Sequence, residues 1–280
     1  TAGQFGRPEH RQTALAAAEE AVTLLKNDGS ALPLARSGSV LVTGPAAKSI
    51  SALHGCWSYT WQGKDEQWYP KGTLTILDAI KEKLGATNVL YRPGVDFDGK
   101  NIDADVAMAE AARADAVVLC LGEDAYAETP GDINDLDLPA GQLDLAKRLF
   151  ATGKPVVLLL VEGRPRVIRE IEAGAKAIVL AYWPGSAGAR AIANVLFGDI
   201  NPSGKLPFTY PRHANNLLTY DRKYTSAVAE ISAPGDTRIN PAKPQWEFGH
   251  GLSYTTFALK NLQLSSAVMK GEHPLGVSVD

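Results

Sequence analysis

Two segments of the sequence combine the residue types that a carbohydrate site needs. Residues 122–137 carry six carboxylates: Glu123, Asp124, Glu128, Asp132, Asp135 and Asp137. Residues 57–69 carry five aromatic side chains: Trp57, Tyr59, Trp61, Trp68 and Tyr69. Carboxylates bond hydroxyls and transfer protons, while aromatic faces stack on the C–H faces of sugar rings. The pairing favours carbohydrate chemistry, although the same residues could also pack a lid and solvate a turn.

Both segments follow apolar runs that are expected to form strands. Six such runs are present: Val40–Thr43, Asn88–Tyr91, Ala116–Leu121, Val156–Val161, Ala177–Tyr182 and Leu206–Thr209. Helical patterns lie between them: Thr73–Leu84, Asp103–Arg113, Ala140–Ala151, Pro165–Glu172 and Ser186–Phe197. This alternation predicts an α/β fold, a mainly parallel six-stranded sheet sandwiched by helices. Ligands of such sheets bind at the carboxyl ends of the strands, where both chemical segments begin.

The two ends of the chain have different patterns. A long helix is expected over roughly His10–Asn27, with Gly29 as its left-handed cap. Residues 213–250 have little periodicity and are expected to form a long wrapping loop, and alternation from Ser253 onward predicts β-structure. The predicted domains are 1–37 as linker and leading helix, 38–212 as α/β sandwich domain, 213–258 as wrapping extension, and 259–280 as the beginning of a fibronectin III-like β-sandwich.

Composition excludes several classes of function. The chain has 280 residues, a net charge of −3 and scattered basic residues, which argues against a nucleic-acid surface or a polybasic membrane patch. No run approaches the ~20 apolar residues of a membrane helix. Thr1 is followed by no signal peptide and is expected to be an internal or processed start. Cys56, Cys120 and five dispersed histidines lack metal-ligand spacing, so neither a metal site nor a cofactor is predicted.

Two alternative functions compete with carbohydrate hydrolysis. Gly44–Ser49 after the first strand hints at a phosphate loop of a nucleotide or flavin binder. The spacing from Gly44 to Lys48 is too short and no glycine precedes the lysine, so a tight strand–helix turn explains it better. The other alternative is a non-catalytic carbohydrate-binding domain that uses the tryptophan segment alone. The acid-rich segment argues against it, because binding alone does not require a proton donor.

The order of residues resembles the C-terminal α/β domain of family 3 glycoside hydrolases. Gly122–Asp132 resembles the acid/base loop of family 3 β-glucosidases and exo-β-glucanases, and Trp57–Gly63 resembles the loop that places a tryptophan over their aglycone-side subsite. Further matches follow in family order: Leu24–Asn27, Leu32–Leu34, Gly163–Pro165, Leu196–Asp199, Asn201–Pro207 and Phe248–Tyr254. The resemblance covers residues 5–260.

The resemblance implies retaining hydrolysis by double displacement, with Glu128 as the general acid/base. That role needs a raised pKa, and the neighbouring carboxylates would push the pKa of Glu128 upward. Glu123 is the rival, but its position just past the strand suits bonding to the loop backbone. Trp61 would stack on the sugar at the leaving-group side. Trp57 is expected to pack beneath the loop, with contact to ligand left open, and Trp68 and Tyr69 are expected to be structural.

The resemblance also implies a partner. The family's nucleophile is an aspartate in a Ser-Asp-Trp-like motif on a preceding (β/α)8 barrel, and this sequence contains no Asp-Trp pair. The barrel, on another chain or removed, would therefore complete a site for β-glucosides or β-glucan oligosaccharides. β-Xylosides remain the alternative substrate, because the sugar pocket would lie in the barrel. No nucleic acid, membrane or cofactor is implied, and the expected location is periplasmic or secreted.

Overall fold

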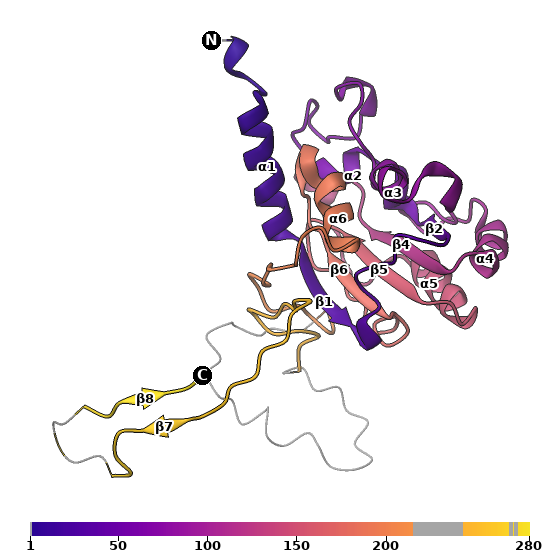
Figure 1. Ribbon diagram of the computed structural model, residues 1–280. Helices are drawn as coiled ribbons and strands as arrows, with labels where there is room; N and C mark the ends of the chain where they lie inside the picture. Colours follow the sequence, from indigo (N-terminus) through magenta and orange to yellow (C-terminus); the bar gives the residue numbers. More distant parts are fainter. Residues whose placement is uncertain (1, 215–242, 269–270, 272–273) are drawn as a thin grey trace.

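A six-stranded sheet forms the centre of the computed structural model, which describes residues 2–214, 243–268, 271 and 274–280 (Figure 1). The strand order is β1-β6-β5-β4-β2-β3. Five strands run parallel: β2 (Val40–Thr43), β3 (Val89–Arg92), β4 (Ala116–Gly122), β5 (Val156–Val161) and β6 (Ala177–Leu180). The edge strand β1 (Thr23–Asn27) pairs antiparallel with β6. The predicted α/β fold with a mainly parallel sheet is confirmed.

Helices cover both faces of the sheet, which explains why its central strands are apolar without alternation. One face packs against α2 (Ser51–His54), α3 (Ile76–Leu84) and α6 (Gly188–Leu196). The other packs against α4 (Ala104–Arg113) and α5 (Ala140–Ala151). Successive strand residues enter opposite cores, as Leu119 and Cys120 of β4 do. The result is the three-layer sandwich that the sequence predicts.

The start of α3 shows how local sequence sets an element boundary. Thr75 Oγ1 accepts a hydrogen bond from the Asp78 main-chain N–H at 3.2 Å, and Asp78 Oδ2 accepts from the Thr75 N–H at 3.1 Å. This reciprocal capping box satisfies two N–H groups that the helix itself leaves unpaired. The helix therefore begins at Ile76, three residues after the start of the predicted helical pattern.

The helix predicted over His10–Asn27 is wrong from Val22 onward. Helix α1 (Pro8–Ala21) ends early, and residues 23–27 form β1. Val22, Leu24 and Leu25 are buried, because pairing with β6 places this segment at the covered edge of the sheet. Burial and strand pairing outweigh the helical pattern here. Gly29, with φ of 60°, follows the strand and does not cap a helix.

Two other predicted elements do not form. Leu206–Thr209 is not a strand: the segment bonds to residues 245–250 only through scattered contacts, such as the bridge between Tyr210 and Trp246, and Pro207 cannot donate a ladder hydrogen bond. Strand β1 takes the place of this sixth strand. Pro165–Glu172 makes turns and a bridge from Val167 to Asp137 in place of a helix. Its arginines extend instead toward the loop after β4.

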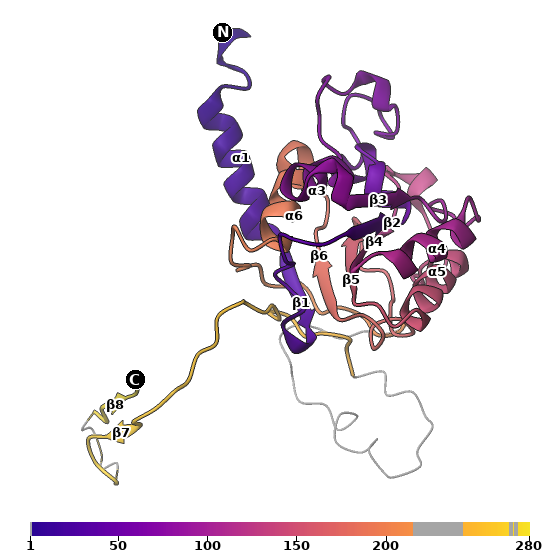
Figure 2. The ribbon, with the colours of Figure 1, turned by 45° about the vertical axis from the view of Figure 1, so that its right-hand side comes forward.

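The ends of the chain extend from the sheet. Helix α1 packs against α6 and projects beyond the body of the sandwich (Figure 2). Strands β7 (Gln263–Leu264) and β8 (Val277–Ser278) form an antiparallel pair that lies apart from the central sheet in both views, so β-structure begins here as predicted. Most of the wrapping loop predicted over 213–250 lies outside the described residues.

Candidate functional site

The sheet order places two loops at a topological switch point. From β2 the chain moves outward to β3, then returns to the other side of β2 as β4 and continues to β5 and β6. The connections after β2 and β4 therefore leave the sheet in opposite directions, and ligands of open α/β sheets bind at such a point, at the carboxyl ends of the strands. Residues 44–75 and 123–139 form those connections. They contain the aromatic and acidic segments that the sequence singled out.

Glu128 lies in the loop after β4 with its side chain exposed. None of the hydrogen bonds and ion pairs of the described residues engages its carboxylate, so the carboxylate is available to a ligand. Its backbone has φ of 54° and ψ of −148°, a region that residues with a side chain rarely adopt. The Glu128 carbonyl accepts a hydrogen bond from the Gly131 N–H at 2.8 Å, which closes a tight turn after it.

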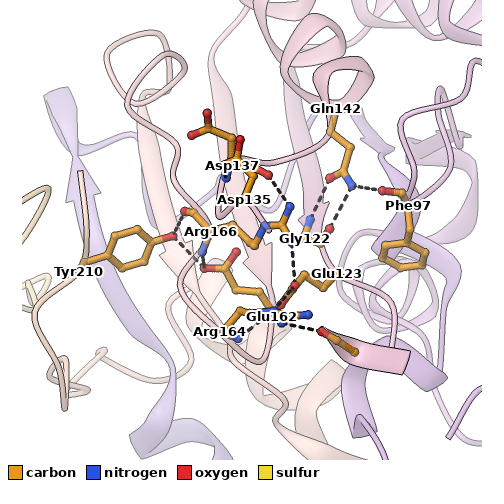
Figure 3. Close-up of polar contacts among 11 residues, drawn as sticks. Phe97, Gly122, Glu123, Asp135, Asp137, Gln142, Glu162, Arg164, Arg166 and Tyr210 are labelled. Atoms are coloured by element: carbon orange, nitrogen blue, oxygen red, sulfur yellow. Dashed lines mark hydrogen bonds and ion pairs between the residues drawn. The ribbon is translucent and has the colours of Figure 1, made fainter. Parts of the chain in front are cut away.

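Gln142 fixes the base of this loop (Figure 3). Its fully buried amide donates to the carbonyls of Gly122 and Phe97 at 3.0 and 2.7 Å, and its Oε1 accepts from the Gly122 N–H at 3.0 Å. The side chain thus pairs with Gly122 as a neighbouring strand would. Sequence reasoning missed Gln142, because a lone glutamine in a helix gives no sign of a main-chain partner.

Glu123 is held by two arginines. The Glu123 carboxylate is 7% exposed and lies 2.7 Å from Arg164 Nε and 2.9 Å from Arg166 Nη1. Arg164 also donates to the Gly131 carbonyl at 2.7 Å and lies over the Tyr126 ring, 3.9 Å from its centroid. Arg164 therefore joins both ends of the acidic loop. These contacts fit the loop-shaping role expected of Glu123, and they occupy the carboxylate that was the rival proton donor.

Part of the charge expected to crowd Glu128 is compensated. Besides the pairing of Glu123, Asp124 lies 2.9 Å from Lys64 and Asp137 lies 2.8 Å from Arg169. The acidic loop is therefore not a simple cluster of like charges. The arginines of residues 164–169 were not identified from the sequence, although the Gly163–Pro165 motif marked the segment.

A second buried glutamate, Glu162, follows β5 beside this network (Figure 3). It is 1% exposed, and burial raises the pKa of its carboxyl group from 4.5 to about 8. The Tyr210 hydroxyl lies 2.8 Å from Glu162 Oε1 and 2.7 Å from the Arg166 carbonyl. The hydroxyl has one proton for two acceptors, so both contacts are hydrogen bonds only when Glu162 is protonated and donates to Tyr210.

The aromatic loop is folded back on itself and leaves most of its rings exposed. Trp61 is 46% exposed and Trp57 is 68% exposed, so the expectation that Trp57 packs beneath the loop is wrong. The Trp57 main-chain N–H donates a hydrogen bond to the Trp61 carbonyl oxygen at 3.0 Å. Tyr69 is buried and its hydroxyl donates to the Gly63 carbonyl at 2.9 Å, which fits a structural role. Trp68 is 60% exposed and does not fit one.

The aromatic and acidic loops are tied directly to each other. Gln62 donates through Nε2 to the Ala127 carbonyl at 3.1 Å and accepts through Oε1 from the Ala127 N–H at 3.0 Å. Lys64 and Asp124 form a second, more exposed link. Because Gln62 follows Trp61 and Ala127 precedes Glu128, the structure brings together the neighbours of two of the predicted site residues. Gln62 lies within the Trp57–Gly63 motif, but nothing in the sequence indicated its main-chain partner.

Trp183 packs below both loops and was also missed from the sequence. Its ring makes an edge contact with Tyr126, with centroids 5.0 Å apart. A Cβ added at Gly55 or Gly163 would meet the ring at 2.3 or 2.5 Å. Glycine is therefore required at both positions for the loops to close over the indole.

The described residues contain no cluster of three or more histidine, cysteine, aspartate or glutamate side chains suited to hold a metal ion. In the same part of the chain, no helix has the length and apolar character needed to cross a membrane. Cys120 is buried in the sheet, and burial raises the pKa of its thiol well above its ordinary value. A neutral, inaccessible thiol fits the buried structural role expected of it.

Comparison with known proteins identifies relatives along almost the whole chain. The model of the glycosyl hydrolase family 3 C-terminal domain matches residues 22–254. A lysosomal β-glucosidase of Dictyostelium discoideum is 41% identical over 94% of this chain and 32% of its own length. A periplasmic β-glucosidase of Salmonella typhimurium is 35% identical over 97% of this chain and 38% of its own length. Other relatives are named β-xylosidases.

The fold is likewise shared with solved structures. A β-glucosidase from Listeria innocua in complex with glucose superposes with a TM-score of 0.77 and 29% sequence identity, over 93% of this chain and 36% of that protein. The chain thus spans about a third of the length of the relatives it matches, 32% and 38% for the two β-glucosidases.

Proposed function

The chain belongs to the glycosyl hydrolase family 3 C-terminal domain family, and from this premise we propose that it supplies the general acid/base to a retaining β-glucosidase or exo-β-glucanase. The substrates would be terminal β-D-glucosidic bonds of β-glucosides or β-glucan oligosaccharides. One observation carries the proposal: Glu128 presents an exposed carboxylate, unpaired among the described residues, on a loop tied through Gln62 to the loop of the exposed Trp61.

In the first step, protonated Glu128 donates its proton to the glycosidic oxygen as the bond from that oxygen to the anomeric carbon breaks. A nucleophilic carboxylate bonds to the anomeric carbon, and the leaving group departs as a neutral alcohol. In the second step, Glu128 takes a proton from water, and the water oxygen displaces the nucleophile from the anomeric carbon. Glu128 is then protonated again for the next cycle.

The aromatic loop would bind the departing part of the substrate. Trp61, exposed and next to the Gln62 link, offers a ring face for stacking at the leaving-group side. Trp57 is still more exposed and is joined to Trp61 by a main-chain hydrogen bond, so it is the second candidate for sugar contact. Both rings lie on the loop after β2, across the switch point from Glu128.

The nucleophile would come from a (β/α)8 barrel outside the 280 residues. Carboxylates of retaining enzymes stand about 5–5.5 Å apart across the scissile bond. Glu123 is occupied by two arginines and Glu162 is buried, so neither is suited to attack. The match covers only 32% and 38% of the two β-glucosidase relatives, so the rest of each is long enough to hold such a domain. The periplasmic relative supports a periplasmic or secreted location.

The proposal is tested with Glu128→Ala in the complete enzyme, with Asp132→Asn as the matched control on the same exposed loop. Loss of the acid should lower kcat/KM for a poor leaving group, such as 4-methoxyphenyl β-glucoside, by about 10²–10⁴-fold. 2,4-Dinitrophenyl β-glucoside needs little protonation and should lose far less. Azide should restore kcat for that substrate by attacking the glycosyl-enzyme without base assistance, giving a glycosyl azide. Equal losses with both glucosides would refute the role of Glu128.

The isolated chain gives a second test of the partner. It should be inactive alone and should gain activity when a barrel domain is supplied. Substantial hydrolysis by the chain alone would mean that it contains its own nucleophile. Parallel assays with aryl β-xylosides decide the sugar, since several relatives are named β-xylosidases. Sugar binding without turnover in the complete protein would instead support a non-catalytic carbohydrate-binding domain.

A further inference from the structure

Within the described structure, other residues hold Glu128 through its main chain and not through its carboxylate. In the described part of the structure, no side chain bonds to the carboxylate, and its φ of 54° and ψ of −148° are rarely adopted by residues with a Cβ. Such a conformation persists only where surrounding contacts over-determine it. Arg164 and the Gly131 N–H hold the chain after Glu128. A different contact holds the chain before Glu128.

Gln62 holds that preceding segment. Its amide accepts from the Ala127 N–H at 3.0 Å and donates to the Ala127 carbonyl at 3.1 Å. The N–H belongs to the peptide plane before Ala127, and the carbonyl belongs to the plane that carries the Glu128 nitrogen. One side chain thus orients both planes leading into Glu128. The partly buried position of Gln62 limits competition from water.

The other link between the two loops is weaker and more distant. The Lys64–Asp124 pair joins side chains that are 50% and 32% exposed, and exposed pairs contribute little to fixing a structure. Asp124 is also four residues from Glu128. Gln62, by contrast, is adjacent in sequence to Trp61 and bonds to the residue before Glu128, so it joins the two loops directly beside both residues.

We propose that Gln62 is a positioning residue that holds the acid/base Glu128 and the subsite residue Trp61 in one fixed arrangement. It touches no substrate and acts through the main chain of Ala127. The inference rests on the proposed role of Glu128, because only a proton donor needs its carboxylate placed against a leaving oxygen. Small displacements of a catalytic group can cost about 100-fold in rate, so the effect is measurable.

The test uses Gln62→Met in the complete enzyme, since methionine keeps the length and volume of the side chain but forms neither hydrogen bond. Gln67→Met is the matched control, because Gln67 is exposed on the same loop. Gln62→Glu keeps the acceptor for the Ala127 N–H and serves as the milder variant should Gln62→Met fold poorly. Tryptophan fluorescence and near-ultraviolet circular dichroism establish that each variant is folded.

We expect Gln62→Met to lower kcat/KM for 4-methoxyphenyl β-glucoside by about 10–100-fold and that for the dinitrophenyl glucoside by less than about threefold. The loss in Gln62→Glu should be intermediate. In a Glu128→Ala background, Gln62→Met should add no further leaving-group dependence, because the two residues act as a unit. Gln67→Met should match the wild type.

Two results would overturn the inference while leaving the proposed function intact. One is a Gln62→Met enzyme that behaves like Gln67→Met with both glucosides. The other is an equal loss with both, which would mark Gln62 as structural only. A Glu128→Ala enzyme without leaving-group dependence would instead overturn the proposed function, so the two failures are distinguishable.

Discussion

Glu162 should make the domain less stable as the pH rises from 6 to 8. The carboxyl group is 1% exposed, and its pKa of about 8 in the fold compares with 4.5 for the free side chain. A folded pKa above the unfolded one means that, between these values, the folded chain keeps a proton that the unfolded chain has released. The free energy of unfolding therefore falls with rising pH across this range.

The magnitude follows from the two pKa values. Each pH unit between them removes about 1.4 kcal/mol from the free energy of unfolding, and the slope halves at pH 8, where the folded group is half ionised. From pH 6 to 8 the loss is about 2 kcal/mol. The contacts of the Tyr210 hydroxyl agree in direction, because its hydrogen bonds to Glu162 and to the Arg166 carbonyl coexist only when Glu162 is protonated.

Glu162→Gln tests this reasoning, since the amide has nearly the same shape and does not ionise. Urea unfolding at pH 6, 7 and 8, followed by tryptophan fluorescence, gives the stability of the variant relative to the wild type at each pH. The relative stability of Glu162→Gln should rise by about 2 kcal/mol across this range. Glu20→Gln, on the exposed face of α1, should show no such trend. A pH-independent difference between Glu162→Gln and wild type would mean that Glu162 is already ionised in the fold.

Two further changes test the supports of the acidic loop. Arg164→Met should lower the free energy of unfolding by about 2–3 kcal/mol and reduce kcat/KM, because Glu123 keeps only one arginine and the Gly131 carbonyl loses its partner. Thermal unfolding and steady-state kinetics measure the two effects, and wild-type values of stability and kcat/KM would contradict the role of Arg164. Gly122→Ala should largely abolish soluble expression, because a Cβ on residue 122 would lie 1.9 Å from the Val161 carbonyl oxygen, and because Gly122 has φ of 144°, which residues with a side chain rarely adopt. A stable Gly122→Ala protein would contradict the close approach of β4 and β5.

Much of the sheet could be predicted because its central strands are marked locally. Strands β4 and β5 are uninterrupted apolar runs, a pattern that only strands covered on both faces need at this length. Strand β1 was missed for the opposite reason. Thr23–Asn27 continues a helical pattern and is extended only because its partner β6 lies some 150 residues later in the chain. No local signal records such a partner.

The location of the candidate site could also be predicted, but not its internal supports. Residue type and the rule that ligands bind at carboxyl ends of strands identified both loops, and the family resemblance singled out Glu128 and Trp61 within them. Gln62 and Gln142 were not predicted, because each bonds to the main chain of a distant residue. Every residue type has main-chain N–H and C=O groups, so the sequence does not indicate which residue a glutamine will bond. The exposure of Trp57 likewise depends on how its loop turns, which composition does not encode.

These supports explain why two glutamates five residues apart can differ in function. The acidic loop is held mainly by hydrogen bonds to its main chain, from Gln142 at Gly122, Gln62 at Ala127 and Arg164 at Gly131. Main-chain contacts leave the side chains between them unconstrained, and Glu128 therefore faces solvent with its carboxylate unpaired in the described structure.

Glu123 is the exception, since its carboxylate itself helps to hold the loop by pairing with Arg164 and Arg166. With 7% exposure and two arginine partners, the Glu123 carboxylate is closed to a ligand. The Glu128 carboxylate, by contrast, is exposed and has no such partner among the described residues. One acidic loop therefore presents Glu128 to a ligand and uses Glu123 as an internal support.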